Sequence, residues 1–255
     1  MEFRAKKVII YVNRVFNLMR VLVIVAHPDD DVLGMGGTML KHAEKGDYVK
    51  VLYMATGITS RRSSNYQNVT KYDYDKKELA KMKKEIESLR ENARKACNIL
   101  KVKDISFYDF PDNEMDSVPL LKVIKTIENE IYSFKPDLVY TTHFGDLNVD
   151  HRIVYEACLT ACRPIAHDVK ELISFEVASS TEWNYPSSFN PNYFVDISKQ
   201  LEKKLKALSM FKNELRSFPH PRSLENLKIV AARWGGVSGN KAAEAFQIIR
   251  KIERK

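Results

Sequence analysis

The stretch that most constrains the fold is residues 21–26 (VLVIVA), which are apolar throughout and mostly β-branched. Such a run is typical of a strand that is covered on both faces. Alternating elements are predicted after it: strands at residues 49–54, 105–108 and 137–141, and helices at 36–45, 77–100, 118–134 and 153–161. This order predicts an α/β fold with a mostly parallel sheet, because parallel strands need a long crossover connection, usually a helix.

The last third of the chain has a less regular pattern. Strands are predicted at 173–178 and 193–195, helices at 198–211 and 239–251, and a loop at 179–192. A second long polar loop, predicted at residues 57–76, carries Arg61 and Arg62, which could meet a phosphate. We therefore expect a Rossmann-like, doubly wound sheet with helices on both faces and a C-terminal β/α extension.

We expect a single domain over residues 19–255, because no repeat, low-complexity tract or linker interrupts it. Residues 1–18 are basic and amphipathic without the features of a signal peptide, so they are predicted to be an N-terminal extension. No apolar run approaches the roughly 20 residues needed to span a bilayer. The three cysteines are Cys97, Cys158 and Cys162; so sparse and odd a set favours a reducing compartment, hence a cytoplasmic location.

The charge balance is basic, with 41 Lys and Arg against 33 Asp and Glu, a formal net charge of +8. Such a balance suits an acidic carrier or peripheral contact with a membrane. We expect no nucleic-acid partner, because many of the Lys and Arg residues alternate with Glu along the predicted helix at 77–100, as on a solvated helix face. The oligomeric state stays open, and a homo-oligomer is compatible with the sequence.

The strongest chemical signal follows the first predicted strand, where His27 stands with the carboxylates Asp29, Asp30 and Asp31 in AHPDDD. In an open α/β sheet, ligand sites form at the carboxyl ends of the strands. Imidazole and carboxylate groups are zinc ligands, and a further carboxylate beside them can act as a general base. The plain alternative, an acidic turn in solvent, fits less well with the glycine-rich helix start that follows.

The second signal, THFGDLNVDHR at residues 142–152, follows the strand predicted at 137–141 and so falls at the same edge of the sheet. His151 can supply a second imidazole, and Asp146 or Asp150 can orient an imidazole through its other nitrogen. Taken alone, the segment also suits a turn whose Asp and Asn side chains cap the next helix. Its pairing with the first motif favours a metal site.

Together the HPDDD and DLNVDHR motifs resemble the PIG-L/LmbE-like family of zinc-dependent de-N-acetylases, with weaker likeness in SSTEWNY, FPHPRS and AAEAF. The resemblance implies one Zn²⁺, with Fe²⁺ or Co²⁺ as alternatives, held by His27, Asp30 and His151. It also implies a hydrolase that removes acetyl from an N-acetylated amino sugar of the GlcNAc type. Zinc-bound water would attack the acetamide, with Asp29 as the general base.

One position departs from a pattern common in the family, a His three residues before the last ligand. Here that residue is Asn148, which can donate a hydrogen bond to an oxyanion but cannot act as an acid. The proton for the leaving amine must then come from Asp29, His143 or His220, and we favour His220 over His143.

Residues proposed to contact the substrate are spread over several segments. They are Arg90, Asp112, His143, Asp146, Trp183 and Arg222. Arg222 could bind a phosphate or carboxylate through two hydrogen bonds, and Trp183 could stack on a sugar ring. Plain alternatives are a solvated helix charge for Arg90 and core packing for Trp183.

The sequence leaves the carrier of the sugar open: it can be free, or linked to a lipid, nucleotide or glycan. A second enzymatic interpretation is a zinc amidase that acts on a thiol conjugate or an antibiotic precursor. A different class is a non-catalytic sugar- or nucleotide-binding protein. That class has no need of Asp29 beside a metal, and the chain has no G-x-G-x-x-G after the first predicted strand.

Overall fold

The structure, a computed structural model, describes residues 18–58, 76–186 and 189–253. The predicted extension at 1–18 and the loop at 57–76, with Arg61 and Arg62, lie almost wholly outside these residues and stay predictions.

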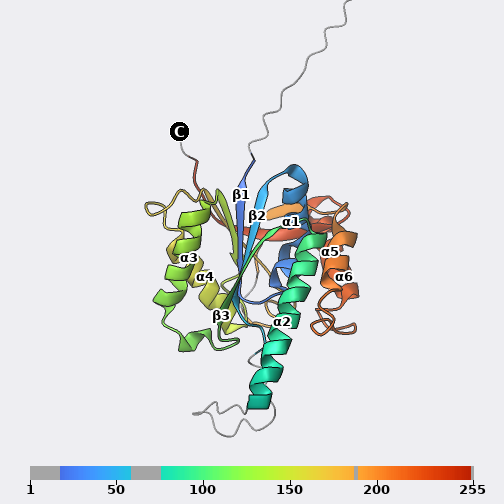
Figure 1. Ribbon diagram of the computed structural model, residues 1–255. Coiled ribbons are helices and arrows are strands. Elements are labelled where there is room, and N and C mark those ends of the chain that lie inside the picture. The colour runs from blue at the N-terminus through green and yellow to red at the C-terminus, as the bar shows by residue number, and fades with distance from the viewer. Residues whose placement is uncertain (1–17, 59–75, 187–188, 254–255) are drawn as a thin grey trace, which may run out of the picture.

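Within the described residues the chain forms one seven-stranded sheet in the order β3-β2-β1-β4-β5-β7-β6 (Figure 1). The strands are β1 (Arg20–Val25), β2 (Tyr48–Ala55), β3 (Asp104–Phe110), β4 (Leu138–Thr142), β5 (Glu171–Phe175), β6 (Tyr193–Asp196) and β7 (Ala243–Lys251). The helices are α1 (Asp30–Lys45), α2 (Lys76–Ile99), α3 (Leu120–Phe134), α4 (Val149–Ala161), α5 (Leu201–Leu208) and α6 (Leu224–Ser238). β1 to β5 pair in parallel, whereas β7 runs antiparallel to both β5 and β6. The predicted mostly parallel α/β fold is confirmed.

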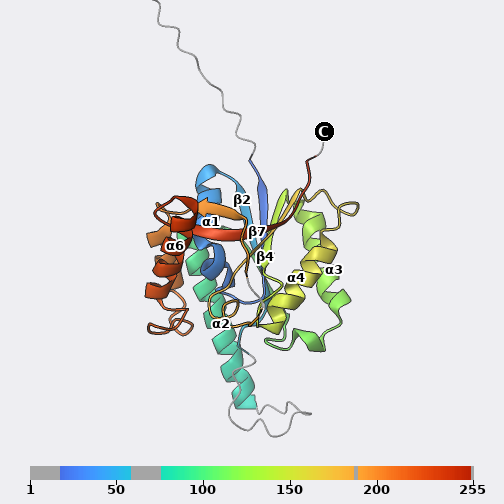
Figure 2. The ribbon, with the colours of Figure 1, turned by 180° about the vertical axis from the view of Figure 1, so that it is seen from behind.

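Helices cover both faces of the sheet (Figures 1 and 2), with α3 and α4 on one face and α1, α2, α5 and α6 on the other. Strand β1 shows how the sequence produces this arrangement. Val21, Val23 and Val25 join the core beneath α1 and α2, while Leu22 and Ile24 join the core beneath α3 and α4. All five side chains are fully buried, so the continuous apolar run of β1 serves two cores at once.

The order in which the strands join the sheet determines where a ligand site is expected. From β1 the chain builds outward through β2 and β3, and β4 then starts again on the other side of β1. The two halves therefore diverge between β1 and β4, and in open α/β sheets ligands bind at the carboxyl ends of strands at such a switch point. Both motifs stand there, in the segments that follow β1 and β4.

Helix α1 begins at Asp30, earlier than the predicted start at residue 36, and runs through the glycine-rich segment. Gly34 is required there, because a Cβ at this position would collide with the ring of Phe175. The helix is interrupted at Met35, whose φ is −141° and ψ is 21°.

Glu244 of β7 compensates for this interruption. Its carboxylate accepts hydrogen bonds from the backbone N–H groups of Gly37 (2.9 Å) and Thr38 (2.7 Å), which begin the second half of α1. The ammonium group of Lys204 on α5 donates to the same carboxylate at 2.6 Å. The C-terminal strand thereby holds the helix that follows the first motif.

The helix predicted at residues 239–251 is wrong: most of this segment is strand β7. Its Ala and Glu residues favour a helix locally, but pairing with β5 and β6 and the complete burial of Phe246 outweigh that preference. The preceding helix α6 was not predicted; Ser223 caps its start by accepting from the N–H of Asn226. Among the described helices, none combines the length and apolar character that crossing a membrane requires.

Candidate active site

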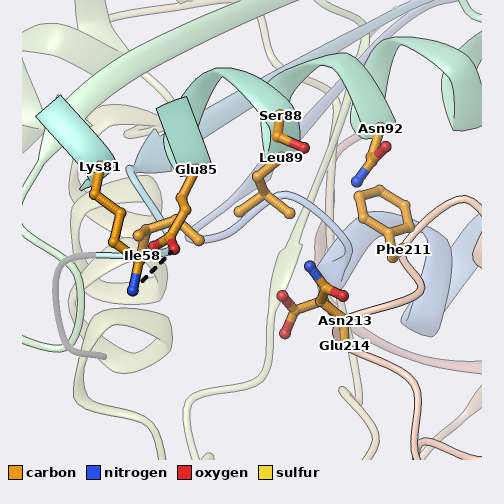
Figure 3. Close-up of a pocket in the computed structure, with 9 residues that line it drawn as sticks. All are labelled: Ile58, Lys81, Glu85, Ser88, Leu89, Asn92, Phe211, Asn213 and Glu214. Atoms are coloured by element: carbon orange, nitrogen blue, oxygen red, sulfur yellow. Dashed lines mark ion pairs between the residues drawn. The ribbon is translucent and has the colours of Figure 1, made fainter. Parts of the chain in front are cut away.

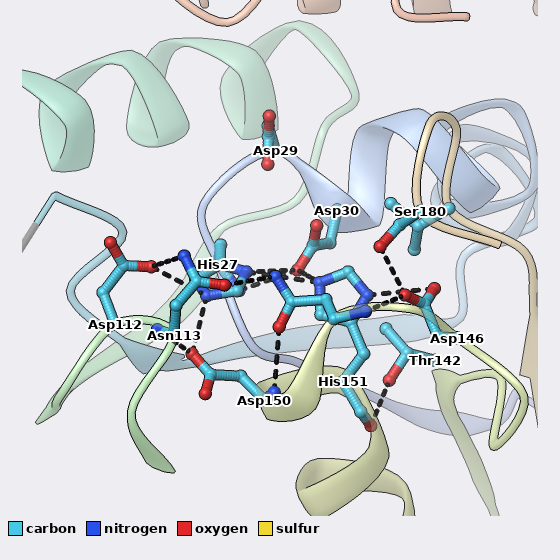
Figure 4. A network of polar contacts seen from close by, with 12 residues as sticks. His27, Asp29, Asp30, Asp112, Asn113, Thr142, Asp146, Asp150, His151 and Ser180 are labelled. Carbon is cyan, nitrogen blue, oxygen red and sulfur yellow. Dashed lines mark hydrogen bonds and ion pairs between the residues drawn. The ribbon is translucent and has the colours of Figure 1, made fainter. Parts of the chain in front are cut away.

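Three side chains from the two motifs converge at the switch point (Figure 4). His27 follows β1, Asp30 opens α1, and His151 lies in the first turn of α4. Nδ1 of His27 lies 3.2 Å from Nε2 of His151 and 3.4 Å from Oδ2 of Asp30. Nε2 of His151 lies 3.2 Å from the same oxygen of Asp30, so the three atoms form a nearly equilateral triangle.

The other nitrogen of each imidazole faces carboxylates. Nε2 of His27 lies 3.0 Å from Oδ2 of Asp150 and 3.0 Å from Oδ1 of Asp112. Nδ1 of His151 lies 3.1 Å from Oδ2 of Asp146. These carboxylates favour a proton on the outer nitrogens, which leaves the lone pairs of the inner nitrogens directed at the triangle.

This donor set fits a divalent ion. In tetrahedral coordination with bonds of about 2.0–2.1 Å, ligand atoms stand about 3.3 Å apart, as these three do. The second oxygen of Asp30, Oδ1, is buried without a hydrogen-bond partner among the described residues. Two imidazoles and one carboxylate suit Zn²⁺, Fe²⁺ or Co²⁺ and leave a coordination position for another ligand.

The electrostatics of the triangle favour a cation. Burial alone would lower the pKa of His27, but its contacts with Asp112, Asp150 and Asp30 raise it well above the usual range. Burial opposes protonation of His151 as well, yet neighbouring carboxylates, led by Asp30, raise its pKa to about 9. Both imidazoles thus lie in a strongly negative environment that a cation would neutralise.

A second group of potential ligands, His27, Asp112 and Asp150, lies on the outer side of His27. It fits an ion less well. Asp150 already accepts hydrogen bonds from the backbone N–H groups of Asn113 (2.6 Å) and Met115 (3.0 Å). Those bonds fix Asp150 as a support for His27.

Asp29 stands beside the triangle at the start of α1, with an unusual backbone φ of 135°. Nη1 of Arg222 donates to its Oδ2 at 2.9 Å, while Nε of Arg222 donates to the carbonyl of Ala178 and to Oγ of Ser179. Burial raises the pKa of Asp29 to about 7, although Arg222 lowers it. The guanidinium therefore fixes the buried carboxylate of a residue whose backbone is strained.

A pocket of about 100 Å³ lies over these groups. His27, Asp29 and Arg222 line it together with Asp112, Asn113, Asn148 and Glu214 among others. Oδ1 of Asn148 caps α4 by accepting from the N–H of Asp150, and its Nδ2 donates to Oδ1 of Asn113 at 2.8 Å. The amide of Asn148 is therefore oriented on the pocket wall by both of its ends.

His220 and Trp183 lie close to Arg222 but do not line that pocket. Nδ1 of His220 accepts the backbone N–H of Arg222 at 3.1 Å, and the ring meets Trp183 edge-on with centroids 5.3 Å apart. Partial burial, aided by Arg216 and Arg222, lowers the pKa of His220. Trp183 is half-exposed, as a surface available for stacking would be.

Two other residues predicted to meet the substrate lie away from the pocket. His143 is buried and packs against the rings of Phe144 and Phe189. Arg90 of α2 forms an ion pair with Asp109 of β3 at 2.5 Å. Neither lines the site pocket.

Sequence reasoning did not identify several residues that support the site. Ser180 and Thr181 both donate to the carboxylate of Asp146, Thr181 at 2.9 Å, and so hold the residue that holds His151. Asn113 and Glu214 line the pocket itself. Ser180 and Thr181 lie in the SSTEWNY segment, but nothing in that segment alone connects them with Asp146.

A family model described as "PIG-L: GlcNAc-PI de-N-acetylase" matches residues 22–162. The match covers more than half of the chain, and the chain belongs to this family. The match includes both motifs and runs from Leu22, within β1, to Cys162, just beyond the end of α4.

Known relatives agree with this assignment. A diacetylchitobiose deacetylase of Thermococcus kodakarensis is 29% identical over 255 residues, covering 94% of this chain and 87% of the relative. The solved N,N′-diacetylchitobiose deacetylase of Pyrococcus horikoshii superposes with a TM-score of 0.69 at 23% identity, over 92% of this chain and 85% of that one. The prediction of a PIG-L/LmbE-like N-deacetylase is confirmed.

The fold by itself does not determine the reaction. The 4-carboxy-2-hydroxymuconate hydratase GalB of Pseudomonas putida superposes equally well, with a TM-score of 0.68 at 21% identity, over 93% of this chain and 99% of that one. The argument for a reaction must therefore rest on the side chains of the site.

Proposed function

We propose that this protein hydrolyses the acetamide of an N-acetylated amino sugar, releasing acetate and a free amine. The observation that carries the proposal is that His27, one corner of the ligand triangle, and Asp29 line the same small polar pocket. Amide hydrolysis needs an electrophilic centre for the carbonyl and a base for water; an ion held by the triangle would supply the first, and Asp29 supplies the second. The relatives named as diacetylchitobiose deacetylases support an amino-sugar substrate.

His27, Asp30 and His151 would hold the ion. When bound, a divalent ion lowers the pKa of water and polarises a carbonyl group. Asp112, Asp146 and Asp150 keep the two imidazoles oriented, which is the usual function of carboxylates around metal-binding histidines. We assign Zn²⁺ as the ion; the same two imidazoles and one carboxylate can also bind Fe²⁺ or Co²⁺.

Asp29 takes the proton of the attacking water. Arg222, which we had assigned to substrate contact, instead positions Asp29 through the 2.9 Å ion pair. Nδ2 of Asn148 has a second N–H that can donate to the oxyanion as it forms. Asp29 lines the pocket and His220 does not, so Asp29 is the better placed of the two to return the proton to the leaving amine.

A panel of N-acetyl substrates tests the proposal. Purified protein loaded with zinc is incubated with N-acetylglucosamine, N,N′-diacetylchitobiose, UDP-N-acetylglucosamine and a lipid-linked N-acetylglucosamine, and acetate is measured. Acetate release from at least one of them is expected. If no sugar releases acetate but an N-acetylated thiol conjugate or antibiotic precursor does, the substrate is one of those compounds and not an amino sugar.

The cysteines support the predicted cytoplasmic location, which we retain as part of the proposal. Cys97, Cys158 and Cys162 are all buried and free. Unpaired thiols are typical of proteins in reducing compartments.

A further inference from the structure

A second cavity adjoins the site pocket, between one face of α2 and the turn that follows α5 (Figure 3). Its volume is about 290 Å³. Leu89 and Glu214 line both cavities and so form their common boundary. A molecule bound in the site pocket can extend into this cavity past these two side chains.

The sizes of the two cavities indicate that such an extension is needed. The site pocket measures about 100 Å³, whereas sites for small molecules typically enclose roughly 300–1,000 Å³. The site pocket can therefore enclose the acetamide and the atoms next to it, but not a larger substrate. The rest of the substrate requires adjacent space.

The walls of the second cavity carry groups that bind hydroxyls. Ser88 and Asn92 project from α2, and Asn213 faces them from the turn after α5. Hydroxyl and amide side chains both donate and accept hydrogen bonds, as a sugar hydroxyl does. These groups suit a neutral ligand with many hydroxyls.

The charges in the second cavity do not suit an anion. Lys81 is the one cation among the described lining residues, and it lies 3.9 Å from Glu85 in an ion pair. Glu214 adds a second carboxylate at the boundary with the site pocket. A phosphate here would meet two carboxylates and one paired ammonium group, so the net charge of +8 does not predict what this cavity binds.

We propose that this cavity is the subsite for a neutral, hydroxylated group joined to the acetylated sugar, with a second sugar ring as the simplest example. The inference rests on the deacetylation proposed above and specifies its substrate. It favours a sugar-linked substrate over a nucleotide- or phosphate-linked one.

The test compares three substrates and two variants of the zinc-loaded full chain. Wild type should show a kcat/KM for N,N′-diacetylchitobiose at least about 10-fold above that for N-acetylglucosamine, and no such gain for UDP-N-acetylglucosamine. Asn92→Leu removes hydrogen bonds to the second ring, and Ser88→Trp fills the cavity. Each should lower the disaccharide-to-monosaccharide ratio of kcat/KM by about 5-fold or more, mainly through KM. Asn98→Leu, on the same helix but outside the cavity, should leave the ratio unchanged.

Three results would overturn the subsite while leaving deacetylation intact: equal kcat/KM for monosaccharide and disaccharide, a preference for the UDP-sugar, or an unchanged ratio in both variants. Absence of acetate release from all three substrates would reject the subsite, and its absence from the lipid-linked N-acetylglucosamine as well would reject the deacetylation.

Discussion

The loops after β1 and β4 contribute differently to the site from the last third of the chain. These loops, with the first turn of the helix that follows each, supply the three atoms of the ligand triangle and also Asp29. The last third supplies groups that hold those atoms: Arg222 bonds Asp29, Ser180 bonds Asp146, and Glu244 bonds the interrupted helix α1. The ligands and the proposed base therefore come from the ends of two strands, whereas their positions depend on segments that are distant in the sequence.

The largest effect is expected for the ligands. His151→Ala removes one of three donors, so the purified protein should lose its metal, and acetate release should fall by at least about 10³-fold. Metal content is measured by elemental analysis. His167→Ala, at a histidine outside the site, should keep the metal content and the acetate release of wild type. A full equivalent of metal in His151→Ala would contradict the ligand assignment.

Asp29→Asn keeps the shape of the side chain but removes the proton acceptor. We expect kcat to fall by about 10²–10⁴-fold, with metal content near that of wild type. Asp116→Asn, at an exposed carboxylate, is the matched control. Near-normal turnover in Asp29→Asn would mean that another group is the base.

Arg222→Gln tests whether the last third acts through the loops. If Arg222 positions Asp29, kcat should fall by about 10–100-fold with little change in KM, and Arg222→Lys should restore part of it. Arg216→Gln, at an exposed arginine, should behave as wild type. A rise in KM at unchanged kcat would return Arg222 to substrate binding.

Ser180→Ala removes one hydrogen bond to Asp146 and so loosens the support of His151. Metal affinity should weaken by about 10-fold, as measured in a competition titration with a chelator. At saturating metal, kcat should stay near wild type. Ser209→Ala, at a half-buried serine that follows α5, serves as the control. Equal metal affinity in Ser180→Ala and wild type would show that Ser180 does not support the site.

The smallest effect on turnover is expected for Glu176→Gln, since the carboxyl group of Glu176 accepts a hydrogen bond from Trp234 on α6 and does not line the site pocket. Burial raises its pKa from the usual 4.5 to about 7, despite a hydrogen bond from Nε1 of Trp234. The folded state therefore binds a proton more tightly than the unfolded state, and wild type loses stability as pH rises from about 4.5 to 7.

Glu176→Gln should remove that loss. Its free energy of unfolding should match wild type near pH 4.5 and exceed it by on the order of 3 kcal/mol at pH 8, as measured by denaturant titration. A variant that is no more stable than wild type at pH 8 would show that Glu176 is ionised in the folded protein without penalty.

The same contrast explains which features of the fold and the site could be predicted from the sequence. The segments that carry His27, Asp30 and His151 could be predicted to meet, because each segment follows a strand and parallel strand ends lie at one edge of the sheet. The assignment of these three residues as the ligand set came from the resemblance to the family. The roles of Ser180, Arg222 and Glu244 were not identifiable, because they depend on where β5, α6 and β7 pack. The helix predicted at 239–251 failed for the same reason: Ala and Glu give local helix preference, and only tertiary pairing makes the segment a strand.

The central claim, a metal-dependent deacetylase centred on the ligand triangle, is tested most directly by removing and restoring the ion. Protein stripped with a chelator is assayed for acetate release from N,N′-diacetylchitobiose, then reloaded with Zn²⁺, Fe²⁺ or Co²⁺. The account predicts that stripped protein is inactive and that about one equivalent of a suitable ion per chain restores activity. Undiminished acetate release from fully stripped protein would contradict it.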